Sequence, residues 1–179
     1  MATKVITGKV RASFVNIFAP KSINGSDPKY SISLIIPKSD KATIGKINAA
    51  IEEAKQNGVP KWGGKIPPNL KTPLRDGDID RPDDDAYADS CFINATSQEA
   101  PGIVDRKRVK ITDPLAIYSG CYVRASVNFY PFNVNGNRGI AAGLANVQFW
   151  EDGEPLNGRV KAEDEFDSLD DDDDEDFLD

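Results

Sequence analysis

Gly120-Cys121-Tyr122-Val123-Arg124-Ala125-Ser126-Val127-Asn128-Phe129-Tyr130 is the stretch of this sequence that decides the fold. Apolar residues stand at every odd position from Cys121 to Phe129, with polar or aromatic residues between them. A period of two predicts a strand with one face in a core and the other on the surface. The loop 131–139 contains the turn signal Asn135-Gly136, and residues 140–150 predict the returning strand of a hairpin.

Further strands are expected at residues 5–15, 30–36, 91–96 and 103–112, where apolar residues alternate or run between turn residues. In the first, Val10, Ala12 and Phe14 are expected to share one face opposite a basic outer face. In the second, Ile32, Leu34 and Ile36 should lie inside and the serines outside.

One helix is expected between Ser39, taken as its N-cap, and Asn57-Gly58, because apolar residues recur there at helical spacing. Residues 58–89 hold five prolines and four glycines, which predicts a long irregular loop. The chain is therefore expected to be mainly β, a barrel of five to six strands with one covering α-helix.

Composition excludes several classes of protein. The 179 residues are 39% apolar, so a core is expected, but no apolar run approaches the ~18 residues that cross a bilayer. With no histidine, Ser-His-Asp and Cys-His catalysis and the usual zinc sites are excluded. Cys91 and Cys121 are predicted to be buried thiols in a reducing compartment. We expect a cytoplasmic protein with no membrane contact, metal or cofactor.

The charge is divided unevenly along the chain. Of the 29 acidic residues, twelve lie in 162–179, which leaves 17 acidic against 22 basic residues in 1–161, a net charge of +5. The sequence therefore predicts a basic domain over 1–161 and a disordered acidic tail over 162–179. The tail also contains Phe166, Leu169, Phe177 and Leu178, which predict that it docks onto a basic groove. The alternative is a tail that only keeps the protein in solution. The tail residues expected to bind a partner are Asp170, Asp171, Asp172, Asp173, Asp174, Glu175, Asp176 and Phe177.

Motifs typical of enzymes are incomplete. A P-loop-like run ends at Lys65 with Ile66 where Ser or Thr should bind magnesium, and a calcium-like loop has Arg81 where glycine is needed. A metal-dependent nuclease using the acidic loop Asp76–Asp89 stays open as an alternative, although its carboxylates are crowded into one flexible segment.

Basic and aromatic residues share the predicted outward faces and loops, and this combination suits single-stranded nucleic acid. Phosphates pair with arginine and lysine, and unstacked bases lie on aromatic rings. The candidate binding residues are Arg11, Trp62, Lys65, Arg75, Arg106, Lys107, Arg108, Tyr122, Arg124, Tyr130, Phe132 and Arg138. An alternative is that Tyr122 and Tyr130 flank a second small apolar cluster, for instance under the long loop.

Five segments in order resemble a known family: Tyr30–Ile36 followed by Pro37-Lys38-Ser39-Asp40-Lys41, then Lys71–Asp78, Phe92–Ala95, the hairpin Tyr122–Gly143 and the acidic tail tipped with Phe177. They resemble the single-stranded DNA-binding proteins of tailed phages and prophages. The resemblance implies an OB-fold, coating of single strands in replication and recombination, and tail contacts to replication proteins. In the plain OB order the helix follows the third strand, whereas here it follows only two clear strands.

The predicted function is therefore non-enzymatic, sequence-tolerant binding of single-stranded DNA, with a tail that competes with DNA and recruits replication or recombination proteins. A homo-oligomer stays open, and a phage-encoded protein would act in the host cytoplasm. Two rivals remain: a DNA mimic or inhibitor that binds a basic protein, and the nuclease named above.

Overall fold

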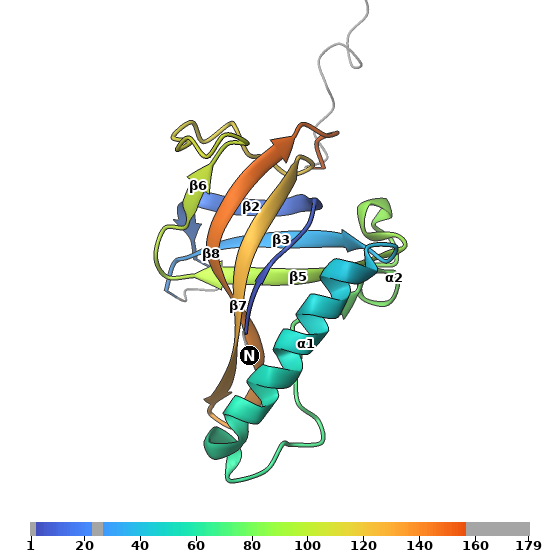
Figure 1. Cartoon of the computed structure of the whole chain (residues 1–179), viewed down its shortest axis with the longest axis vertical. Coiled ribbons are helices and arrows are strands. Elements are labelled where there is room, and N and C mark those ends of the chain that lie inside the picture. Colours follow the sequence, from blue (N-terminus) through green and yellow to red (C-terminus); the bar gives the residue numbers. More distant parts are fainter. Residues whose placement is uncertain (1–2, 23–26, 157–179) are drawn as a thin grey trace, which may run out of the picture.

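Five strands close a barrel in the computed structural model, which describes residues 3–22 and 27–156. In spatial order they are β2 (Val10–Lys21), β3 (Lys29–Pro37), β5 (Ser90–Ser97), β8 (Asn137–Glu151) and β7 (Tyr122–Val134), which pairs again with β2. All these neighbours are antiparallel except β5 and β8, which run parallel. Figure 1 shows β7 and β8 as two long curved strands that cross over β2, β3 and β5. This architecture confirms the predicted mainly β, OB-fold-like barrel.

Three short strands extend the sheet. β1 (Lys4–Ile6) pairs with β7, β6 (Gly102–Val104) pairs with β8, and β4 (Arg75–Asp76) pairs with β5. Between β3 and β5 the chain forms α1 (Lys41–Gly58), the 3-10 helix η1 (Val59–Trp62), the short helix α2 (Gly77–Asp80) and the 3-10 helix η2 (Asp85–Tyr87). The rest of this segment is irregular, as predicted. None of the described helices is long and apolar enough to cross a membrane.

The covering helix α1 begins one residue later than predicted. Asp40, not Ser39, is its N-cap, because the Asp40 carboxylate accepts a hydrogen bond from the Thr43 backbone N–H at 3.1 Å. Ile47 and Ile51 are buried in the main core, as their spacing predicted. The helix follows β3, the second of the five barrel strands along the chain. The barrel is therefore an elaborated form of the plain OB order.

The hairpin is longer than its sequence predicted. Residues 131–134 and 137–139, expected in a loop, continue β7 and β8, and only Asn135 and Gly136 connect the strands. Both connecting residues have positive φ, 51° and 83°, as a tight two-residue hairpin turn requires. In contrast, the predicted strand 103–112 ends at Val104, because the Asp105 carboxylate accepts hydrogen bonds from the backbone N–H groups of Lys107 and Val109 and makes a turn.

A bulge in β2 reverses the predicted orientation of Phe14. The pairing of β2 with β3 shifts between Ser13 and Asn16, and Phe14 has a φ of 46°. Ser13 is consequently buried, and Phe14 is 53% exposed. The prediction that Phe14 faces the core with Val10 and Ala12 is wrong for this residue.

The outer side of β3 is also covered. Ser33 is buried and its hydroxyl lies 3.0 Å from the Tyr87 hydroxyl, while Ile35, Tyr87 and Phe92 form a second small core under residues 77–89. Ser33 therefore lies on the outer side of β3 as predicted, but the covering segment buries it. Both cysteines are free thiols; Cys121 is buried as predicted, whereas the prediction is wrong for Cys91, which is half-buried.

Candidate nucleic-acid interface

The outer side of the β7–β8 hairpin carries a continuous row of polar and aromatic side chains. Cross-strand pairing sets Arg124 opposite Gln148, Ser126 opposite Asn146, and Asn128 opposite Gly143. The edge strand β1 adds Lys4 opposite Asn128 and Ile6 opposite Ser126. Residues paired across a sheet share one face. We call this surface the hairpin face; it comprises Lys4, Ile6, Arg124, Ser126, Asn128, Tyr130, Phe132, Gly139, Ala141, Gly143, Asn146 and Gln148.

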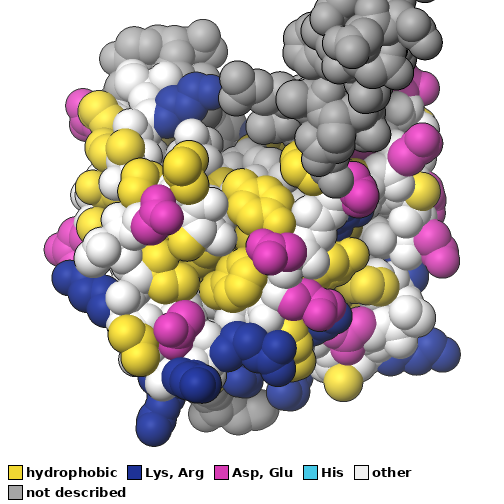
Figure 2. Space-filling model, turned by 90° about the horizontal axis from the view of Figure 1, so that it is seen from above, with side chains coloured by type: hydrophobic (Ala, Val, Ile, Leu, Met, Phe, Trp, Pro, Cys, Tyr) yellow, Lys and Arg dark blue, Asp and Glu magenta, His cyan; other side chains and the backbone are white. Residues whose placement is uncertain are grey.

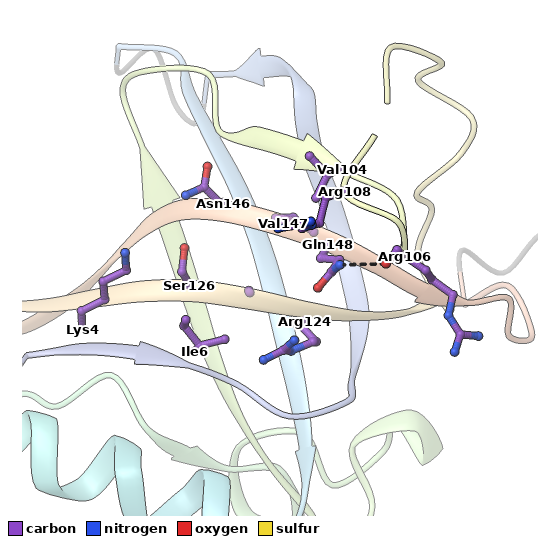
Figure 3. Close-up of a pocket in the computed structure, with 11 residues that line it drawn as sticks. Lys4, Ile6, Val104, Arg106, Arg108, Arg124, Ser126, Asn146, Val147 and Gln148 are labelled. Carbon is purple, nitrogen blue, oxygen red and sulfur yellow. Dashed lines mark hydrogen bonds between the residues drawn. The ribbon is translucent and has the colours of Figure 1, made fainter. Parts of the chain in front are cut away.

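A hollow of about 400 Å³ lies at one end of the hairpin face. Figure 3 shows side chains from β1, β7 and β8 and from the turn after β6 arranged around it. It is lined by Lys4, Ile6, Val104, Arg106, Arg108, Arg124, Ala125, Ser126, Asn146, Val147 and Gln148. Four of these residues are cationic and none is acidic. We call this site the basic hollow.

Among the described residues, no carboxylate neutralises the four cations of the basic hollow. In residues 3–22 and 27–156, no carboxylate forms an ion pair with Lys4, Arg106, Arg108 or Arg124. The Arg124 guanidinium donates a long hydrogen bond of 3.4 Å to the Thr7 carbonyl. Like charges held close together repel one another, and an anionic ligand relieves that repulsion. A phosphate backbone is a ligand of this kind.

The turn that carries the arginines is fastened to the sheet. The Gln148 side-chain amide donates hydrogen bonds to the carbonyls of Asp105 at 3.2 Å and Arg106 at 3.4 Å. Arg108 adopts a φ of 70°, within the turn that the Asp105 carboxylate stabilises. The arginines are therefore held beside β8 rather than carried on a free loop.

A second, smaller hollow adjoins the first and adds aromatic surface. It shares Arg106, Arg124 and Gln148 with the basic hollow and is also lined by Phe149 and Trp150, which are half-buried. Sequence reasoning missed Trp150 and Lys4 as site residues. Trp150 stands at the end of a predicted strand with no further signal, and Lys4 lies outside the stretch whose alternation is recognisable.

Two further rings lie along the hairpin face beyond the hollow. Tyr130 is 42% exposed, and a Cβ placed on Gly143 would lie 3.3 Å from its ring. Phe132 is half-buried, and a Cβ on Gly139 would lie 2.9 Å from its ring. Both rings therefore rest against backbone where β8 has no side chain, which fits a flat surface on which bases can stack.

Trp62 is not a surface ring, contrary to the prediction. It is 4% exposed in the main core, and its indole N–H donates to the Phe132 carbonyl at 3.0 Å. Its ring also touches the backbone of Gly58, where a Cβ would come within 2.6 Å. Trp62 fixes η1 to β7 and offers no face for a base.

Tyr122 lies outside the hairpin face, although the alternation of β7 predicted it there. The pairing of β7 with β8 shifts between Tyr122 and Val123, and Tyr122 packs beside β2. The Lys9 ammonium lies 4.8 Å and the Arg11 guanidinium 5.8 Å from the centre of its ring. Arg11 also donates hydrogen bonds to the carbonyls of Gly120 and Glu154. Both predicted residues are thus engaged within the fold.

The other predicted cations are scattered. Arg75 is exposed on β4 and lies 3.8 Å from the Asp80 carboxylate. Lys65 is exposed after η1, and Lys107 is exposed in the turn but does not line the hollow. Arg138 stands opposite Asn133, whose side chain bonds to Lys61, so it belongs to the other face of the hairpin. The structure brings together Arg106, Arg108 and Arg124 and leaves these four apart.

The acidic loop 76–89 is occupied by internal contacts. Lys38 forms ion pairs with Asp76 at 3.0 Å and Asp78 at 2.7 Å. Hydrogen bonds from Lys38 and from the Asp89 backbone N–H lower the pKa of Asp78. The Asp84 carboxylate accepts from the Ala86 N–H at the start of η2. These carboxylates hold the loop in place, and the described ranges contain no cluster of three or more potential metal ligands.

The end of the barrel beside the basic hollow has a mixed surface. Figure 2, which looks onto this end, shows hydrophobic side chains in the middle, with acidic and basic side chains around them. The lining of the basic hollow differs because all its charges are positive. The predicted tail, including Asp170–Phe177, lies outside the described residues.

Comparison with known proteins identifies the family. A family model described as the single-stranded DNA-binding protein of Enterobacter phage Enc34 matches residues 3–178. This chain belongs to that family. The putative protein p50 of Acyrthosiphon pisum secondary endosymbiont phage 1 is 34% identical over 182 residues, which cover 93% of this chain and 94% of p50.

Solved structures agree with the family assignment. The Enc34 single-stranded DNA-binding protein in complex with single-stranded DNA has a TM-score of 0.78 at 28% identity, covering 87% of this chain and 90% of that one. The gp2.5 single-stranded DNA-binding protein of bacteriophage T7 has a TM-score of 0.62 at 19% identity, covering 90% and 91%. The second likeness shows a shared fold alone.

Proposed function

We propose that this member of the Enc34 family binds single-stranded DNA along the hairpin face and performs no reaction of its own. The observation that carries the proposal is the basic hollow, in which four cations without carboxylate partners in the described chain surround a cavity. Aromatic rings extend the same surface at Trp150 on one side and at Tyr130 and Phe132 on the other.

The binding mechanism follows from these two kinds of group. Arginine and lysine neutralise phosphates, and the release of counterions makes the affinity depend on salt. Bases stack on the rings at about 1–3 kcal/mol each, with little regard to sequence. A duplex keeps its bases stacked inside and cannot use the rings. The protein should therefore prefer single strands to duplex DNA. We expect it to bind them in the cytoplasm of the host cell during phage replication and recombination.

The experiment compares salt dependence in two variants. Replacing Arg106, Arg108 and Arg124 by alanine should weaken binding of a labelled single strand. The salt slope should fall by about 0.7 for each phosphate that is no longer neutralised, thus by about 2. The matched control replaces Lys41, Lys46 and Lys61, exposed on the α1–η1 side, by alanine. Fluorescence anisotropy between low and moderate salt gives both slopes. Equal slopes in the two variants would contradict the proposed interface.

The acidic tail competes with DNA in this proposal. Residues 162–179 carry twelve carboxylates and the rings of Phe166 and Phe177, the same two kinds of group that a single strand presents as phosphates and bases. Tethering gives the tail a high effective concentration, of order millimolar for a short flexible linker. When DNA displaces the tail, it becomes free to recruit a replication or recombination protein.

Ending the chain at Lys161 tests the tail. The shortened protein should bind single strands more tightly, most strongly at low salt where charge attraction is least screened. Affinity measured at several salt concentrations for both forms provides the comparison. If the shortened form binds no better at any salt concentration, the tail does not compete for the DNA site.

A gel shift separates the two rival functions. A DNA mimic would bind no oligonucleotide, and a nuclease using Asp76–Asp89 would degrade a labelled strand only with magnesium. The proposal predicts a stable shift of single-stranded over duplex DNA in both magnesium and chelator.

A further inference from the structure

The basic hollow is lined by neutral polar side chains as well as by cations. The neutral polar residues are Ser126, Asn146 and Gln148. These three come from neighbouring positions of one antiparallel pair, in which Ser126 faces Asn146 and Gln148 faces Arg124.

Ser126 is a polar residue buried on β7. It is 8% exposed, and its hydroxyl makes no hydrogen bond within the part of the chain that the structure describes. Burying a hydroxyl without a partner opposes folding, so such groups are rare and require an explanation. The oxygen is closed off from solvent in this structure, so a ligand in the hollow provides one when the side chain rotates to meet it.

Gln148 is oriented by the turn it fastens. Its amide nitrogen donates to the carbonyls of Asp105 and Arg106, and this leaves the side-chain oxygen to accept a hydrogen bond from a ligand. Figure 3 shows this oxygen on the side away from the dashed bond to the turn. An amide oxygen is only an acceptor. The ligand that fits must therefore carry a donor at this point.

Apolar residues complete the wall. Ile6 and Val104 line the hollow with the polar groups, and Ile6 is 50% exposed. Ala125 and Val147 also border it, but they are buried in the main core. A volume of about 400 Å³ falls within the range of sites for small planar ligands. Apolar walls with a few placed hydrogen-bonding groups suit a flat heterocycle better than a phosphate.

We propose that the basic hollow receives one unstacked nucleobase and prefers a base that carries an exocyclic amino group over thymine. The Gln148 oxygen accepts from the amino group, and the Ser126 hydroxyl and the Arg124 guanidinium donate to acceptors of the same base. Thymine has a carbonyl oxygen where cytosine has its amino group, so it places an acceptor against an acceptor. The inference rests on the proposed function, because the base arrives as part of a bound strand.

The experiment uses two oligonucleotides that differ at one nucleotide. The full chain is titrated with labelled oligo(dT) of about 16 nucleotides and with the same strand carrying one central dC. A single dC suffices because the protein can shift along the strand to bring it into the hollow. The dC strand should bind about three- to tenfold more tightly, the range that one or two hydrogen bonds provide.

Two serine variants test whether the Ser126 hydroxyl contacts the base. Ser126→Ala removes an unpartnered group, so thermal stability should stay equal or rise, while the dC advantage should fall below about twofold. The matched control is Ser33→Ala, because Ser33 is also buried on a strand but bonds to Tyr87. That variant should lose stability and keep the dC advantage.

The possible results of these titrations test the base pocket and the proposed function separately. Equal affinity of the wild-type protein for both strands overturns the base pocket and leaves single-strand binding intact. Equal weakening of both strands by Ser126→Ala also overturns it, because the hydroxyl would then contact the backbone. Failure to bind either strand at low salt overturns the proposed function itself.

Discussion

Two outer surfaces of the same barrel differ in whether their polar and aromatic groups are satisfied by the chain. On the loop-covered face, defined as the outer side of β3 and β5 under residues 77–89, the Arg81 guanidinium lies 5.2–5.9 Å from the ring centres of Phe14, Tyr87 and Phe92. Lys38 pairs there with two aspartates. On the hairpin face the arginines of the basic hollow have no carboxylate partner among residues 3–22 and 27–156.

In this molecule, the balance of positive and negative charges distinguishes a surface that makes internal contacts from a surface that binds a ligand. Both surfaces place arginine near aromatic rings, so composition alone does not distinguish them. The loop-covered face supplies its own anions and its own covering segment, whereas the basic hollow has an open cavity and a single sign of charge. A surface whose charges are left unbalanced is the one on which a ligand gains binding energy.

The largest effect is expected on the loop-covered face. Tyr87→Ala removes a fully buried ring that stacks edge-to-face on Phe92, so stability should fall by about 3–5 kcal/mol. Urea unfolding measures this loss, and DNA affinity of the folded variant should not change. Tyr87→Phe is the control, because it removes only the hydroxyl next to Ser33 and should cost about 1 kcal/mol. A large loss of DNA affinity in Tyr87→Ala would contradict the placement of the DNA interface on the hairpin face.

A smaller effect is expected on the hairpin face. Tyr130→Ala should weaken single-strand binding by about 1–3 kcal/mol with little change in stability, because its ring is exposed. Tyr122→Ala should weaken binding less, since that ring lies under Lys9 and Arg11. The double variant should resemble Tyr130→Ala alone in anisotropy titrations. If Tyr122→Ala has the larger effect, DNA passes over β2 instead of the hairpin face.

The smallest effect is expected from the ion pairs of the acidic loop. Lys38→Met should lower stability slightly at neutral pH and low salt, because the side chains of Lys38 and Asp78 are 35% and 47% exposed and solvent screens their attraction. The pKa of Asp78 is lowered in the folded state, so its contribution is complete above the unfolded value and is lost as pH falls through the folded value. Thermal unfolding should therefore show wild-type and variant converging below about pH 4. A difference that persists in acid would exclude Asp78 as its source.

Much of the fold could be predicted because it depends on local pattern. The alternation of β7 buried Val123, Ala125, Val127 and Phe129 as expected, and the spacing of α1 placed its apolar side in the core. Failures occurred where pairing or packing overrides that pattern. A bulge turned Phe14 outward, and a covering loop buried Ser33. Neither the bulge nor the covering loop can be recognised from the spacing of apolar residues in the sequence around it.

The site was predicted in part for a related reason. Arg106, Arg108 and Arg124 were recognised as candidates from their charge, and the structure brings them to one hollow. Lys4 and Trp150 join them only because β1 pairs with β7 and because β8 ends beside the turn at Arg106. The prediction for Trp62 failed because a tryptophan between lysines and glycines gives no local sign that its ring packs under β7.

The sequence by itself determined which segments extend, where one amphipathic helix lies, and that a basic body precedes an acidic end. These features depend on periodicity and composition, which act within a few residues. Only the tertiary structure decided which basic and aromatic side chains meet. That choice follows from the closure of the barrel and the register of β7 with β1 and β8, which brings residues more than a hundred positions apart to one surface.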